Sequence, residues 1–130
     1  KIIMKNIKKF LILGFHSANI MLIIFYLYPR SIFGHVLYDD SSIQPQLTRD
    51  FIVSSNHLYA FIILSFLGVV AYQKTQKLSF VIIYLIILSI ILELLHTIIP
   101  TREFEWSDLF GNIFGVFFVI IIYKIKSKYA

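Results

Sequence analysis

Residues 78–100 read LSFVIIYLIILSIILELLHTIIP, and this stretch decides the class of fold. Between Leu78 and Ile99 it contains one acidic side chain, Glu93, no lysine or arginine, and Pro100 follows directly. A helix that crosses a hydrocarbon core of about 30 Å needs about 20 mainly apolar residues. We therefore predict a transmembrane helix here, ended by the proline.

Three more apolar stretches of similar length surround it, at residues 10–28, 51–72 and 106–123. The 130-residue chain is 58% hydrophobic, with a mean hydropathy of +0.82. A soluble domain of this size could not bury so much apolar surface, because small folds leave much of their surface in water. We predict a single domain over residues 1–130, an all-α membrane protein with four transmembrane helices at about 10–28, 51–72, 78–99 and 106–123.

The charged residues are segregated along the chain. All lysines lie before the first predicted helix, between the second and third, or after the fourth. All three arginines, and every acid except Glu93, lie in the other two connections. Because excess basic residues mark cytoplasmic loops, we expect both termini to be cytoplasmic. The net charge of +5 then reflects topology and contact with the lipid bilayer, and we expect no nucleic-acid partner.

The connections complete the layout. Residues Gln73–Lys77 are too few to do more than join two helices in a short antiparallel hairpin. The connection Pro29–Asp50 is long, and its apolar middle, residues 32–38, is expected to lie in the outer membrane interface. The chain has no cysteine, which excludes disulfides and thiolate metal sites.

Polar residues gather near the outer ends of three predicted helices. A charged carboxylate at the membrane depth of Glu93 costs about 2.5 kcal/mol or more, so this side chain must be protonated, paired or open to water. His96 lies on the same helical face at i+3. We predict one outward-facing cluster with these members: His57, Glu93, His96, Arg102, Asp108 and Asn112. His16 and Asn19 lie nearer the inner side, and we interpret them as isolated hydrogen-bonding residues between helices.

The fourth predicted helix contains a GxxxG spacing, Gly111 and Gly115, which permits close helix contact. We expect both glycines to face another helix, the third predicted one, and so to carry Asn112 and Asp108 toward Glu93.

Residues 93–115, ELLHTIIPTREFEWSDLFGNIFG, resemble the C-terminal signature of VanZ-like membrane proteins. The residues at matching positions are Glu93, Pro100, Arg102, Phe104, Trp106, Asp108, Asn112 and Gly115. The chain departs from the pattern at His96, where the family usually has Gln. It also has Val53 and Ser54 where an upstream family motif has Asp and Lys, although His57 and Phe61 fit that motif.

The resemblance implies a multi-pass protein of the bacterial cytoplasmic (inner) membrane with a role in the cell envelope. The family is named for a protein associated with low-level resistance to teicoplanin. The resemblance supplies no reaction.

Several functions fit this pattern. The cluster could bind a lipid-linked or glycopeptide-type ligand, with Arg102 holding an anionic group and Trp106 stacking nearby. It could instead be a structural network, with Arg102 paired to Glu93 or Asp108, in a small accessory subunit packed against other membrane-protein subunits.

An acid–base enzyme acting on an envelope substrate is a further alternative, since a partly desolvated Glu or His can act near neutral pH. No serine has an evident base beside it, so we lean against an enzyme. Glu93 and His96 have the spacing of helix metal ligands, with His57 as a third. Arg102 would oppose a cation, and only Asp108 adds a carboxylate. We therefore predict no metal and no cofactor.

Overall fold

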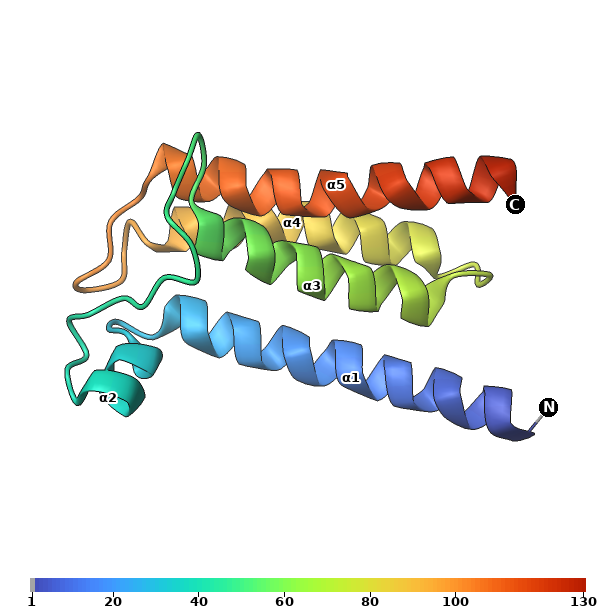
Figure 1. Cartoon of the computed structure of the whole chain (residues 1–130), viewed down its shortest axis with the longest axis horizontal. Helices are drawn as coiled ribbons and strands as arrows, with labels where there is room; N and C mark the ends of the chain where they lie inside the picture. The colour runs from blue at the N-terminus through green and yellow to red at the C-terminus, as the bar shows by residue number, and fades with distance from the viewer. Residues whose placement is uncertain (1) are drawn as a thin grey trace.

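The computed structural model describes residues 2–130, which form five α-helices and no strand (Figure 1). The helices are α1 (Ile2–Leu27), α2 (Ile32–Tyr38), α3 (Ser55–Tyr72), α4 (Leu78–Leu95) and α5 (Trp106–Tyr129). All except the short α2 are long and apolar enough to span a membrane. This confirms the predicted all-α membrane fold.

The four long helices run side by side, and their connections separate to the two ends (Figure 1). Both termini and the α3–α4 turn lie at one end, whereas α2 and the long connections lie at the other. The lysine-bearing segments of residues 2–130 therefore share one end, as predicted. We call the opposite end the loop end. Its assignment as the outer face stays a prediction from the lysine excess.

The helix ends differ from the predicted ones for local reasons. α3 begins at Ser55 rather than Phe51, because the Asp50 carboxylate accepts the Ser55 N–H at 2.9 Å and the chain bends before it. α4 ends at Leu95, because Pro100 lacks an N–H and disfavours helix in the residue before it. α1 and α5 extend through their basic ends, beyond the apolar stretches.

The interfacial segment 32–38 forms α2. Ser31 caps it, with its hydroxyl oxygen accepting the Gly34 N–H at 2.8 Å. Asp39 ends it in the left-handed conformation, with φ 52°. This short helix lies beside the end of α1, where Phe33 packs against Phe25 with ring centroids 4.8 Å apart.

The core lies between α3, α4 and α5, with α1 packed mainly against α3. Phe61, Leu85 and Val116 are fully buried there, and α1 adds Phe15. Most other large apolar side chains are exposed on the bundle surface, which suits contact with lipid.

The two glycines of α5 do face a helix, but the expected partner is wrong. They pack against α3, the second membrane helix, and not against α4. A Cβ on Gly115 would lie 2.7 Å from the Leu58 carbonyl oxygen and 2.8 Å from the Phe61 Cβ. A Cβ on Gly111 would lie 2.8 Å from the Ser54 carbonyl oxygen. Asn112, one residue further round the helix, is the residue that reaches α4.

The two inner polar residues of α1 form single interhelical hydrogen bonds, as predicted. His16 Nε2 lies 2.8 Å from the Tyr72 hydroxyl of α3, and the Tyr84 hydroxyl of α4 donates to Asn19 at 2.8 Å. Both bonds fix α1 against the bundle and lie apart from the loop-end cluster.

Gly115→Ala should reduce the free energy of unfolding in detergent by about 1 to 3 kcal/mol, because the new methyl group meets backbone and Cβ atoms that cannot move independently. Gly14→Ala is the matched control, since a Cβ there meets nothing within 4 Å. It should be neutral or stabilising, by up to about 1 kcal/mol, through helix propensity. Equal unfolding free energies for the two variants would contradict the close α3–α5 contact.

Candidate functional site

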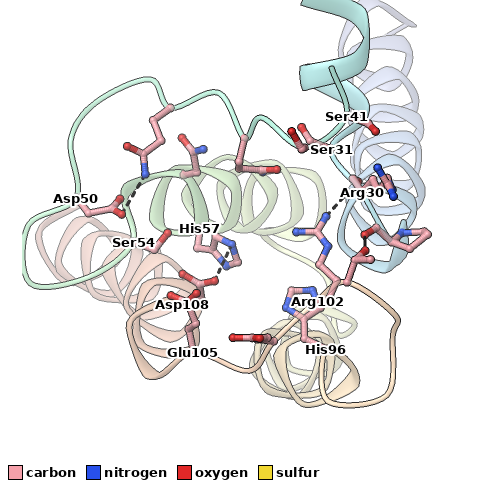
Figure 2. Close-up of a pocket in the computed structure, with 17 residues that line it drawn as sticks. Arg30, Ser31, Ser41, Asp50, Ser54, His57, His96, Arg102, Glu105 and Asp108 are labelled. Atoms are coloured by element: carbon pink, nitrogen blue, oxygen red, sulfur yellow. Dashed lines mark hydrogen bonds and ion pairs between the residues drawn. The ribbon is translucent and has the colours of Figure 1, made fainter. Parts of the chain in front are cut away.

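The loop end of the bundle brings all six predicted site residues together. His57 comes from α3, Glu93 from α4 and His96 from the residue after it, Asp108 and Asn112 from α5, and Arg102 from the α4–α5 connection. Figure 2 labels His57, His96, Arg102 and Asp108 around one opening, with Asp108 facing His57 and with Arg102 above His96. The contacts among them are specific, and they divide into three parts.

Glu93 forms the first part. Its side chain is fully buried, and one oxygen, Oε1, accepts the backbone N–H of Glu105 at 3.0 Å. The His96 Nδ1 lies 3.3 Å from the same oxygen. The other oxygen, Oε2, makes no hydrogen bond with any described residue and lies 3.8 Å from His57 Nδ1. The two oxygens of one carboxylate therefore have different surroundings.

Asn112 forms the second part and orients His57. The Asn112 side-chain oxygen accepts the Tyr26 hydroxyl at 2.7 Å, and its amide donates to the Ser89 carbonyl oxygen at 3.1 Å. These two bonds fix which end of the amide faces His57 Nδ1, 3.2 Å away. Because that end is an acceptor, Nδ1 carries a hydrogen. The other ring nitrogen, Nε2, lies 3.4 Å from Asp108 Oδ2.

Arg102 forms the third part, and among the described residues it makes no direct ion pair with Glu93 or Asp108, the partners that the structural-network hypothesis gave it. Its guanidinium instead donates to carbonyl oxygens at the end of α1: Nε to Tyr28 at 3.1 Å, and Nη2 to Phe25 at 3.3 Å and Arg30 at 3.4 Å. The last carbonyls of a helix have no partner within it, and that end of the helix favours a cation.

Burial lowers the pKa of the Arg102 guanidinium, while Asp108 and Glu93 oppose that shift. Thr101 supports the same contact, because its hydroxyl donates to the Pro29 carbonyl oxygen. The α4–α5 connection thus closes the end of α1. The Arg102 Nη1 makes no hydrogen bond within residues 2–130, which leaves donors for a ligand.

Trp106, which the binding hypothesis placed near Arg102, packs against the aromatic rings of Phe104 and Phe110. Its side chain is 65% exposed and stacks on Phe110, with centroids 6.0 Å apart. It lines neither loop-end cavity. We place it among the interfacial aromatic residues of the membrane surface.

Two residues that help to build the site were not predicted from the sequence. Tyr26 holds Asn112, and its ring lies 4.9 Å from His57 and 5.9 Å from His96. A tyrosine hydroxyl near the outer end of an apolar helix was the available signal. Asp50 accepts the Ser55 N–H at 2.9 Å, and this bond lowers the pKa of the Asp50 carboxyl group. Its position just before a helix is the signal of a cap.

Two cavities meet at this end. The polar one, of about 670 Å³, opens among the connections and is lined by Arg30, Asp50 and Asp108, among others (Figure 2). The apolar one, of about 770 Å³, lies between α1, α2 and α3 and is lined by Phe25, Leu37 and Ile63, among others. Seven residues line both: Ser31, Gln44, Gln46, Asn56, His57, His96 and Arg102.

The acidic and histidine side chains also include a set with metal-ligand geometry. His57, Glu93 and Asp108 each offer one ligand atom, and these three atoms lie within 4.8 Å of one another. His96, which the sequence pairs with Glu93 at ligand spacing, is outside this set: its Nδ1 faces Glu93 Oε1, and its Nε2 lies 3.0 Å from the Tyr26 carbonyl oxygen.

Comparison with known proteins gives one match. A model of the family described as VanZ/LLP1 matches residues 6–127, which is nearly the whole chain. No curated protein and no solved structure matches it.

Arg102→Lys should lower the free energy of unfolding by about 1 to 3 kcal/mol, because a lysine cannot reproduce several fixed N–H donors toward the carbonyls of α1. Arg30→Lys is the matched control, since the Arg30 side chain forms no ion pair or hydrogen bond within residues 2–130, and it should change stability little. Chemical denaturation in detergent would measure both. An Arg102→Lys protein as stable as the control would show that these bonds do not fasten α1.

Proposed function

The chain belongs to the VanZ-like family, as a multi-pass membrane protein, and we propose that it binds a lipid-linked ligand with an anionic head group. The observation that carries the proposal is the meeting of the two cavities at seven shared residues. A ligand that fills both would be polar at one end and apolar at the other. Each cavity lies within the usual size of ligand pockets, about 300 to 1,000 Å³.

The apolar cavity suits the chain of such a ligand. It lies between α1 and α3, with residues of α2 such as Leu37 completing its wall. Its walls are side chains such as Met21, Phe25 and Ala60. In a bilayer, a lipid tail could enter it sideways between two helices. This favours a lipid-linked ligand over a wholly polar glycopeptide.

The polar cavity suits the head group. Arg30 and Arg102 both line it, and Arg102 keeps the two N–H donors of Nη1. Guanidinium groups recognise phosphate and carboxylate through paired hydrogen bonds. If the loop end is the outer face, as the lysine distribution predicts, the head group would be bound there, in keeping with a role in the cell envelope.

Farnesyl phosphate, an isoprenyl chain with a phosphate head, tests this proposal. Binding to the protein in detergent or nanodiscs would be measured by calorimetry, with farnesol as the tail alone and inorganic phosphate as the head alone. We expect farnesyl phosphate to bind at least tenfold more tightly than either, because a charge-assisted hydrogen bond contributes about 1.5 to 3 kcal/mol.

Two variants locate the binding. Arg30→Gln should weaken farnesyl phosphate binding about tenfold, and Ala60→Phe should block the apolar cavity. Arg49→Gln is the matched control, because Arg49 lies in the same connection as Arg30 and lines neither cavity. Equal binding of farnesyl phosphate and farnesol, or equal affinity of all three variants and the parent, would contradict the proposal.

A further inference from the structure

We propose that His57, Glu93 and Asp108 form a binding site for a divalent transition-metal ion, best matched by Zn²⁺. Their three ligand atoms come from three different helices, α3, α4 and α5, and lie within 4.8 Å of one another. The inference goes beyond the lipid ligand and does not depend on it. It also revises the expectation, drawn from the sequence, that no metal is bound.

The strongest sign is the second oxygen of Glu93. The carboxylate is fully buried, and its Oε1 already receives the Glu105 N–H, while Oε2 accepts no hydrogen bond from residues 2–130. That free oxygen points at His57, 3.8 Å away. A buried carboxylate oxygen without a donor is costly, and a bound cation is one of the few groups that compensates it.

The imidazole of His57 lies between two carboxylates. Its Nδ1 is 3.8 Å from Glu93 Oε2, and its Nε2 is 3.4 Å from Asp108 Oδ2. A neutral imidazole has a single N–H, and because Nδ1 carries it toward Asn112, the lone pair of Nε2 faces the Asp108 carboxylate. A second proton on the ring, a proton on the Asp108 carboxyl group or a cation between the two groups would each remove that repulsion. Imidazole nitrogen and carboxylate oxygen are both ligands of Zn²⁺.

The charges favour the cation. The sequence argument against a metal was the opposing charge of Arg102, but its guanidinium donates to the Tyr28 and Phe25 carbonyl oxygens at the end of α1. Asp108 and Glu93 supply two negative charges to balance a divalent ion. His57 supplies the softer nitrogen ligand that Mg²⁺ and Ca²⁺ do not prefer.

The surroundings resemble those of metal ligands elsewhere. With Zn–N and Zn–O bonds of about 2.0 to 2.2 Å, ligand atoms around a tetrahedral ion lie about 3.4 Å apart, so atoms that are now up to 4.8 Å apart would have to approach by about 1.4 Å at most. The Glu105 N–H and His96 hold Glu93 Oε1, as outer hydrogen bonds orient ligating carboxylates. His57 and Asp108 line the polar cavity, so the fourth position would open to it.

Metal content and spectroscopy test the site. The full chain, purified with a tag that contains no histidine, would be stripped with a chelator and titrated with Zn²⁺, Mg²⁺ and Co²⁺. We expect one equivalent of Zn²⁺ by elemental analysis after desalting. Mg²⁺ should bind at least 100-fold more weakly than Zn²⁺. Co²⁺ should give the visible absorption of a four- or five-coordinate ion.

His57→Gln and Asp108→Asn should each weaken Zn²⁺ binding about 100-fold or more, since even outer hydrogen bonds to metal ligands are worth about 10- to 100-fold. His35→Gln and Asp39→Asn make the same chemical changes outside the cluster and should bind like the parent. Stripped parent and variants should share the same thermal unfolding without metal, which separates lost binding from lost folding.

A parent protein that retains less than a tenth of an equivalent of Zn²⁺ and gives no Co²⁺ absorption would overturn the site. Zn²⁺ binding that survives both His57→Gln and Asp108→Asn would also overturn it. The calorimetry with farnesyl phosphate uses the chelator-stripped protein. Neither of these results therefore affects the measured binding of farnesyl phosphate. The two proposals therefore fail separately.

Discussion

The rest of the loop end depends on one buried carboxylate, that of Glu93. At that depth an acid needs partners, and the chain supplies them from outside its own helix. Its Oε1 takes the Glu105 N–H and faces His96, which folds the α4–α5 connection over the end of the bundle. Arg102, held in that connection, then fastens α1 through the carbonyl oxygens of its last turn. Oε2 has no such partner, and it faces the site.

The second constraint is the close approach of α5 to α3. Because Gly111 and Gly115 have no side chains, α5 packs directly on the backbone of α3 at Ser54 and Leu58. With the glycine face of α5 against α3, Asn112 on the next face is directed toward α1 and α4, where it forms hydrogen bonds with Tyr26 and Ser89. The same packing also sets Asp108 opposite His57. One packing contact therefore determines both the stability of the bundle and the arrangement of its polar cluster.

The sequence predicted the four spans, the common end of the lysine-bearing segments and the gathering of six polar residues, because hydropathy and charge act over whole segments. It did not correctly predict which helices and which groups contact one another. A GxxxG spacing shows that a helix approaches another closely, but not which one, and α3 rather than α4 lies against Gly115. The partners of Arg102 are backbone carbonyls, which exist at every residue and leave no mark in composition. Tyr26 was missed because only the fold shows that its hydroxyl meets Asn112.

The most direct test of this account compares Glu93→Gln with Glu93→Leu by their free energies of unfolding in detergent. Glutamine keeps an oxygen for the Glu105 N–H, so the account predicts a loss within about 1 kcal/mol, from one altered hydrogen bond. Leucine leaves that N–H and the His96 Nδ1 without a buried partner, so we expect a loss of about 2 kcal/mol or more. A leucine variant as stable as the glutamine variant would contradict the claim that Glu93 holds the loop end together.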